Sequence, residues 1–214
     1  MTNAPTPTPV KIWGRISSIN VRKVVWTAQE LGLPFTRVDA GGAFGIVKTA
    51  AYQTLNPNAL VPVVEDDGFV LWESNVIVRY WCAKHSPGAL YPSDLRERFD
   101  AERWMDWQQT TLNPAGRDAF WQLIRNPDGQ INQAKVQASI AATEPLFDRL
   151  DAHLRDRPWV CGDRLTMADI PLACEVHRWS GLPIERAPRP HLDRWYAQIQ
   201  ARPASRGVLE LPVS

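Results

Sequence analysis

The fold is decided by one stretch, LVPVVEDDGFVLWESNVIVRYW, which runs from Leu60 to Trp81. A short β-branched run interrupted by Pro62 leads into the turn residues Glu65 to Gly68, and a second run, Phe69 to Leu71, follows. This pattern is typical of a β-hairpin, with glycine supplying the positive φ of the turn. From Glu73 onward the apolar residues recur at helical spacing, so a helix is predicted directly after the second strand.

Both ends of this stretch offer groups that suit a ligand. Pro62 has no N–H and cannot lie in the middle of a strand ladder, so the main chain of Val61 is free to pair with an extended ligand. Ser74 begins a helix whose unpaired N–H groups suit a carboxylate, and Glu73 beside it suits an amine. Together these groups match an amino-acid-like or short-peptide ligand. The alternative is that Pro62 only ends an edge strand and that Glu73 and Ser74 only cap the helix, and these residues by themselves favour that alternative.

The residues before the hairpin predict a βαβ unit. Val10 to Gly14 and Phe35 to Val38 are the expected strands, and between them apolar residues from Val21 to Leu31 recur at i, i+3, i+4 and i+7. Two strands that flank a helix are expected to be parallel, with a right-handed connection. Ligands of open α/β sheets bind where a strand passes into a helix, which places a candidate site at residues 15–20.

Within that connection, Ser18 and Asn20 are both natural helix N-caps. A hydroxyl at the positive end of a helix can stabilise an anion such as a thiolate, and Ser18 would do so as a donor. The alternative is that the pair only caps the helix, and this segment by itself favours it.

After the hairpin and its helix the β-branched runs disappear. Residues 1–9 alternate threonine and proline and are expected to be a disordered or extended lead-in, residues 10–85 an α/β domain, 86–92 a linker and 93–214 an all-helical domain. Helices are expected over 93–111, 117–124, 133–155 and 191–200, with a break or bend at 113–116. Pro145 predicts a kink or a helix start. Thr166 to Asp169 has the pattern of a side-chain cap before an apolar run.

Composition excludes several classes of protein. The chain has 214 residues and a formal net charge of +1 without a basic cluster, which argues against a nucleic-acid surface. No apolar run is long enough to span a membrane, and residues 2–9 do not form a signal peptide. Three widely spaced cysteines and four isolated histidines have no metal-ligand spacing, so no metal is expected, and a reducing cytoplasm is the simplest compartment.

Four motifs in order resemble the cytosolic glutathione transferases: SSINVRKV at 17–24, LNPNALVPVV at 55–64, LWESNVIVRYW at 71–81 and RLTMADI at 164–170. The resemblance covers residues 10–203 and is to serine-type members, bacterial and related to the theta and phi classes. It implies a thioredoxin-like N-terminal domain that binds glutathione as co-substrate. It also implies an all-α C-terminal domain that shapes the electrophile site, and a homodimer.

The resemblance also implies roles for individual residues near the thiol. Ser18 matches the activating serine, and Ser17 is the rival because the alignment can slip by one residue. Asn20 supports the thiolate or caps the helix. The candidates for the electrophile pocket are Ile16, Trp104, Trp107, Thr111 and Trp179, of which Ile16, Trp107 and Thr111 are preferred, although core or dimer packing is the commoner role of such residues.

Further roles concern the ends of glutathione. Val61 would pair its main chain with the cysteinyl residue, with Pro62 in the cis form. Glu73 and Ser74 would hold the amine and carboxylate of the γ-glutamyl residue. Lys48 is the best match to the residue that holds the glycyl carboxylate, and Val47 is the alternative.

The implied function is conjugation of the glutathione thiolate to an electrophilic, apolar or aromatic substrate, a detoxification reaction. One alternative is a non-catalytic carrier of glutathione or hydrophobic ligands, and another is an interaction module of the kind fused to larger proteins. A third is a glutathione-dependent peroxidase, isomerase or dehalogenase with the same fold. The sequence does not distinguish between these alternative functions.

Overall fold

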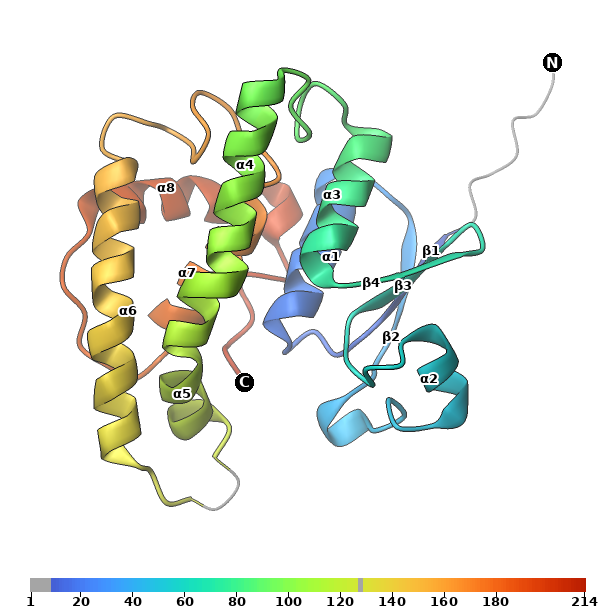
Figure 1. Cartoon of the computed structure of the whole chain (residues 1–214), viewed down its shortest axis with the longest axis horizontal. Helices are drawn as coiled ribbons and strands as arrows, with labels where there is room; N and C mark the ends of the chain where they lie inside the picture. Colours follow the sequence, from blue (N-terminus) through green and yellow to red (C-terminus); the bar gives the residue numbers. More distant parts are fainter. Residues whose placement is uncertain (1–8, 127–128) are drawn as a thin grey trace.

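The computed structural model describes residues 9–126 and 129–214, so the predicted lead-in, apart from its last residue, lies outside the described residues. An α/β part comes first and an all-helical part follows, and the two lie side by side (Figure 1). The predicted fold class, thioredoxin-like followed by all-α, is confirmed. The elements of the first part are β1 (Val10–Trp13), α1 (Ile19–Glu30), β2 (Phe35–Val38), the 3-10 turn η1 (Gly42–Phe44), α2 (Ala50–Leu55), β3 (Val63–Asp66), β4 (Phe69–Trp72) and α3 (Ser74–His85).

The four strands form one sheet in the order β2-β1-β3-β4. β1 is parallel to β2 and antiparallel to β3, with Ile12 opposite Val64, and β3 and β4 are antiparallel. The predicted βαβ unit and hairpin are therefore both confirmed. Side chains alternate along a strand, so Ile12 and Val64 belong to the core beneath α1 and α3, whereas Trp13 and Val63 pack with α2.

The helical part differs from its prediction in one place. Its elements are α4 (Leu95–Trp107), the π-helix η2 (Gln108–Leu112), α5 (Asn113–Ile124), α6 (Gln133–His153), α7 (Asp169–Ser180), α8 (Pro190–Gln200) and the 3-10 turn η3 (Pro203–Ser205). The chain was expected to break or bend at 113–116, and no break occurs there, because the backbone stays helical from the π-helix through Asn113 and Pro114 into α5. The irregular turn comes earlier, as a π-helix. Pro145 lies inside α6 and does not begin a helix.

The predicted cap at Thr166 to Asp169 is a structural centre of the helical part. The Asp169 carboxylate accepts hydrogen bonds from the Thr166 N–H at 2.8 Å, the Val160 N–H at 3.0 Å and the Trp195 indole at 2.8 Å. Burial raises the pKa of Asp169, and these hydrogen bonds oppose the rise by stabilising the anion. The carboxylate thus joins the start of α7 to α8 and to the loop before them.

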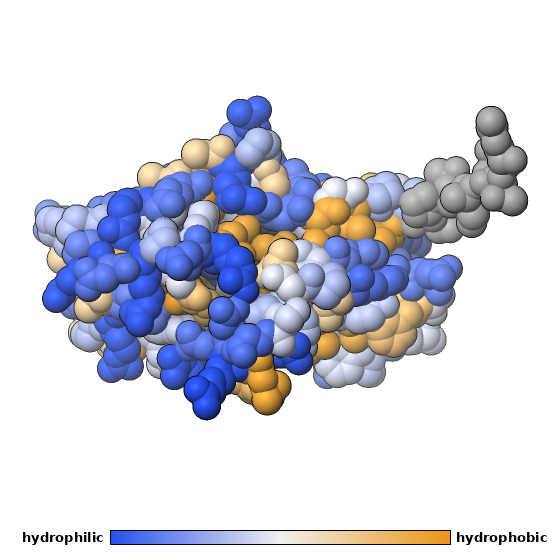
Figure 2. All heavy atoms as spheres, turned by 90° about the horizontal axis from the view of Figure 1, so that it is seen from above, coloured by the Kyte–Doolittle hydropathy of each residue, from blue (hydrophilic) through white to orange (hydrophobic). Residues whose placement is uncertain are grey.

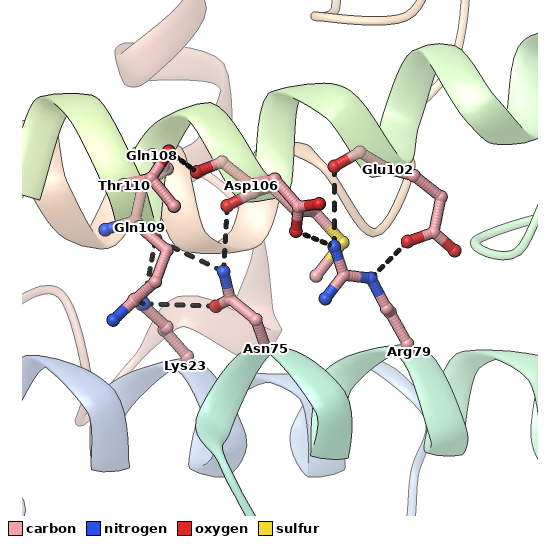
Figure 3. A network of polar contacts seen from close by, with 9 residues as sticks. Lys23, Asn75, Arg79, Glu102, Asp106, Gln108, Gln109 and Thr110 are labelled. Atoms are coloured by element: carbon pink, nitrogen blue, oxygen red, sulfur yellow. Dashed lines mark hydrogen bonds and ion pairs between the residues drawn. The ribbon is translucent and has the colours of Figure 1, made fainter.

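A buried polar network joins the two parts. Lys23 on α1 is fully buried, and its Nζ donates to Asn75 Oδ1 at 3.1 Å, Gln108 Oε1 at 2.9 Å and Gln109 Oε1 at 3.3 Å. Figure 3 shows these side chains reaching from α1 and α3 to the helix above them, where Arg79 makes a second set of contacts. The wider π-helical turn brings two consecutive glutamines to one lysine, so the irregular turn is part of the contact between the domains.

In residues 9–126 and 129–214 no helix is long and apolar enough to cross a membrane. The same ranges contain no group of three histidine, cysteine, aspartate or glutamate side chains placed to hold a metal ion.

Candidate active site

Ser18 is the N-cap of α1 and lies at the wall of a cavity between the two parts. Its backbone is extended, with φ of −79° and ψ of 125°, and its N–H donates to Arg15 O at 3.1 Å. Its hydroxyl makes no hydrogen bond with any residue in the described ranges. Only 8% of Ser18 is exposed, so a free hydroxyl stands at the positive end of a helix in a mostly dry position.

The cavity has a volume of about 340 Å³ and is formed by both parts of the chain. Three predicted catalytic residues, Ser17, Ser18 and Asn20, all line it, together with Leu60 from the segment before β3. Its remaining walls come from α1, α5, α7 and the chain near residue 213, and they are Ile19, Arg22, Asn113, Arg117, Phe120, Trp121, Arg125, Cys174, His177, Arg178 and Val213. The structure therefore brings the predicted thiol-activating residues to a wall shared by both domains.

Asn20 and Ser74 connect the starts of two helices. The Ser74 hydroxyl donates to Asn20 Oδ1 at 3.2 Å, so the first turn of α3 lies beside the first turn of α1. Ser74 is buried, whereas Glu73 before it is exposed and has a φ of 71°. A left-handed backbone costs a residue with a side chain about 1–3 kcal/mol, and such strain collects at functional sites. The predicted pair therefore stands at a helix start that is fixed in position relative to Ser18.

Val61 and Pro62 have the geometry that the sequence predicts. The bond between them is cis, and Val61 lies just outside the ladder of β3, which begins at Val63. Neither the N–H nor the C=O of Val61 makes a hydrogen bond within the described part of the chain. A Cβ built on Gly14 would lie 3.2 Å from the Val61 Cβ, so Val61 packs against the connection that leads to Ser18. An extended main chain could therefore pair with Val61 close to Ser18.

The other predicted residues lie apart from the cavity. Lys48 is exposed, follows η1 and precedes α2, and has no hydrogen bond or ion pair to a described residue. Ile16 and Trp107 are half-buried and pack against the core, and Trp107 has an edge contact with Trp104. Neither they nor Thr111 are among the lining residues. The electrophile role of these three residues stays a prediction.

Four arginines of the cavity were not found from the sequence. Arg22 lies on the buried face of α1 and is only 3% exposed. A charged residue on an otherwise apolar helix face is the sequence feature that could have identified it as a functional residue. Arg117 is exposed on α5, Arg125 directly follows α5, and Arg178 is buried on α7, and none of the three carries a sequence signal of its own. Burial, and then the neighbouring cations Arg15, Arg178 and Arg22, lower the pKa of Arg125 to about 10. The site thus combines a free hydroxyl with a concentration of positive charge.

The chain is similar to known proteins over nearly its whole length. Residues 17–84 match the family model described as glutathione S-transferase, N-terminal domain, and residues 112–203 match glutathione S-transferase, C-terminal domain. The glutathione S-transferase GstB of Escherichia coli K12 is 41% identical over 207 residues, which cover 96% of this chain and all of that protein. Glutathione S-transferase 3 of Zea mays is 30% identical over 202 residues, covering 92% of this chain and 91% of that one.

A solved structure extends the comparison to the fold. The theta class glutathione S-transferase from the citrus canker pathogen Xanthomonas axonopodis pv. citri, solved with glutathione bound, superposes with a TM-score of 0.93. It is 42% identical in sequence, and the match covers 97% of this chain and 100% of that one. The sheet and the helical part described above are therefore similar in fold to those of a protein solved with glutathione bound.

Proposed function

The chain belongs to the cytosolic glutathione S-transferase family and is a glutathione transferase, and on this premise we propose that Ser18 activates the thiol. One observation carries the proposal: the Ser18 hydroxyl is free, faces a cavity and stands at the positive end of α1. A thiol has a pKa of about 8.5, and a hydrogen bond together with a helix N-terminus lowers it. Ser18 acts as a donor to the thiolate and not as a base, since a serine hydroxyl does not titrate near neutral pH.

Glutathione binds along the edge that leads to Ser18. Val61 offers its free N–H and C=O to the cysteinyl residue, as a neighbouring strand would. Ser74 and the free N–H groups of α3 receive the γ-glutamyl carboxylate, and Glu73 receives the amine. Lys48 is the cation on the same part of the chain for the glycyl carboxylate. The similarity to a structure with glutathione bound supports this placement.

Contacts and burial distinguish Ser18 from its two rivals. Asn20 Oδ1 accepts the hydrogen bond from Ser74, so its role is to hold the two helix starts together. The main-chain oxygen of Ser17 accepts a hydrogen bond from Arg125 at 3.0 Å, which fixes this residue against α5. Ser18 lies between them and is the residue whose hydroxyl is both nearly buried and free. The thiolate held there attacks an electrophilic carbon, and the leaving group departs with the bonding electron pair.

Turnover with a simple neutral electrophile tests the assignment. With iodoacetamide we expect Ser18→Ala to lower kcat/KM about 100-fold, which is the effect of removing one donor from a developing or bound anion. The Kd for glutathione measured by calorimetry should change less than about threefold, because Val61 and Ser74 carry most of the binding. Ser17→Ala is the matched control and should keep near wild-type turnover. Full activity of the Ser18 variant would transfer the role to another group.

The finer features of the function are also proposals. Exposed apolar residues on β4, α3 and α4 support a homodimer through that side, and they are Phe69, Trp72, Val76, Leu95 and Phe99. In Figure 2 the face over the helical half is mostly hydrophilic, and more hydrophobic surface appears toward the sheet.

We propose a cytoplasmic detoxification enzyme whose two domains are joined by the linker at residues 86–92. Sedimentation of the purified chain tests the dimer, and a monomer at micromolar concentration would contradict it.

A further inference from the structure

The cations around the cavity have no part in the activation of the thiol proposed above. Four of the lining residues are arginines, and no aspartate or glutamate is among the lining residues that the structure describes. Arg22 lies on α1, Arg117 on α5, Arg125 at the end of α5 and Arg178 on α7. The positive charge is therefore concentrated by the tertiary fold, since these residues are far apart in the sequence.

Two of these guanidinium groups are already held by the protein. Arg178 forms an ion pair with Glu175, and this pair is buried. Arg22 donates to the main-chain oxygens of Val208, Leu211 and Pro212, and also to the oxygen of Ile16, and it has no acidic partner among the described residues. Arg22 therefore anchors the end of the described chain and has little capacity left for a ligand.

The other two guanidinium groups have donors to spare. Arg125 donates through Nε and Nη2 to the main-chain oxygen of Ser214, and through Nη2 to that of Ser17. Its Nη1 has no hydrogen bond within residues 9–126 and 129–214. Arg117 makes no hydrogen bond or ion pair with any residue in those ranges. Free guanidinium donors on the wall of a cavity are the groups that recognise a carboxylate.

Arg22, Arg117 and Arg125 have no aspartate or glutamate partner among the described residues, and like charges gathered in this way raise the free energy of the empty site. The repulsion between these cations contributes to the lowered pKa of Arg125, which burial lowers first and three neighbouring arginines lower further. A bound anion relieves this repulsion, because it supplies the missing negative charge in a partly dry cavity.

Building on the proposed function, we propose that the electrophile is a small organic anion, a carboxylate with a leaving group on the adjacent carbon, held by Arg117 and Arg125. Arg125 contacts the main chain of Ser17, the neighbour of Ser18, so a carboxylate on its free donor lies beside the thiolate. The cavity of about 340 Å³ is at the small end of ligand pockets, which suits a small substrate. Phe120, which lies under the Arg125 guanidinium at 4.8 Å, forms an aromatic wall.

The reaction is a substitution at saturated carbon. The glutathione thiolate supplies the electron pair of the new carbon–sulfur bond, and the halide leaves with the pair of the carbon–halogen bond. The product is a thioether that keeps the carboxylate, and neither oxidant nor reductant is needed. Glutathione loses its thiol proton on binding, before this step.

Iodoacetate and iodoacetamide separate charge recognition from catalysis. They share the reacting carbon and the leaving group and differ in one negative charge. We expect the ratio of kcat/KM for iodoacetate over iodoacetamide to exceed the ratio of the uncatalysed reactions with glutathione at least tenfold. Arg117→Gln and Arg125→Gln should each lower the enzymatic ratio five- to tenfold, and tenfold corresponds to about 1.4 kcal/mol. Arg117→Lys keeps the charge and should retain most of the ratio. Arg149→Gln, on the exposed side of α6 and outside the cavity, is the matched control and should leave the ratio unchanged.

Binding of the two products gives a second measurement that does not need turnover. Calorimetry compares S-(carboxymethyl)glutathione with S-(carbamoylmethyl)glutathione, and we expect the carboxylate to bind at least tenfold more tightly to the wild type. The difference should shrink five- to tenfold in Arg117→Gln. Weak binding of both products would count against the proposed function and against the anion site. Tight but equal binding would overturn the anion site alone.

Three further results would overturn the anion site. The first is a wild-type ratio equal to that of the uncatalysed reactions. The second is a ratio unchanged in both glutamine variants, which would leave the arginines with the role of anchoring residues 208–214. The third is an effect confined to the KM for glutathione or to the pKa of its thiol, which would assign the arginines to the co-substrate.

Discussion

Replacement of Lys23 by methionine should change how stability depends on pH, because this lysine is an ammonium group in a dry position. Lys23 is fully buried on α1, and burial lowers its pKa from 10.5 to about 8, although the nearby Glu175 carboxylate opposes the change. The native state therefore gives up the proton near pH 8, whereas the unfolded chain keeps it until near pH 10.5. Between these values the unfolded state binds more protons, so stability rises with pH.

The interval between the two pKa values fixes the size of the effect. One pKa unit is worth about 1.4 kcal/mol, so the charged form of Lys23 costs the native state about 3 kcal/mol below pH 8. This cost disappears as the pH rises to 10.5. Methionine has a similar shape and no charge, but it leaves Asn75 Oδ1 without its donor and Gln108 Oε1 with only the long hydrogen bond from Asn75 Nδ2 at 3.4 Å. The wild type should consequently gain about 3 kcal/mol relative to Lys23→Met between pH 7.5 and 10.5.

Urea unfolding at fixed protein concentration measures this difference at each pH. The matched control is Lys135→Met, an exposed lysine on α6, whose curve should stay parallel to that of the wild type. Parallel curves for the wild type and Lys23→Met would refute the reasoning, since they would mean that the lysine titrates alike in both states. Asn75 follows Ser74 directly, so we also expect weaker glutathione binding by Lys23→Met at neutral pH.

Two further predictions concern the frame of the site. Gly14→Ala would place a Cβ 2.4 Å from Val21 Cγ2 and 3.2 Å from the Val61 Cβ. This crowding should lower the free energy of unfolding in urea by about 2 kcal/mol or more and should weaken glutathione binding. Wild-type values for both quantities would contradict this packing. His177 has a pKa lowered from 6.5 to about 4, first by burial and then by Arg22, so the unfolded state binds the extra proton first and stability falls as the pH falls through this window. His177→Gln should remove about 3 kcal/mol of that acid sensitivity, as measured by urea unfolding at pH 7 and pH 4. Equal acid sensitivity in the variant and the wild type would show that the imidazole titrates normally.

The parts of the fold that follow from local patterns were predictable. A turn sequence between two β-branched runs predicted the hairpin, and the spacing of apolar residues predicted α1. The cis bond before Pro62 followed from the family resemblance and is confirmed by the backbone. Asn113 and Pro114 show the limit of such patterns, because proline has the same appearance in sequence whether it ends a helix or occupies its first turn.

The site was predictable on the α/β side and not on the helical side. Ser18, Asn20 and Ser74 lie at helix starts that spacing and capping chemistry identify. The arginine cluster depends on α1, α5 and α7 meeting in space, and no spacing within the sequence brings Arg117 to Arg178. The buried contacts of Lys23 could not be predicted for the same reason: its hydrogen-bond partners come from α3 and η2, which are distant in the sequence.

The measurement that tests the central claim most directly is a titration of the thiol of bound glutathione, followed by the ultraviolet absorbance of the thiolate. The wild type should bind glutathione with a thiol pKa well below the free value of about 8.5. Ser18→Ala should raise the pKa of the bound thiol by one to two units, since a hydrogen bond to an anion is worth about 1.5–3 kcal/mol. An identical thiol pKa in the wild type and in this variant would contradict the account.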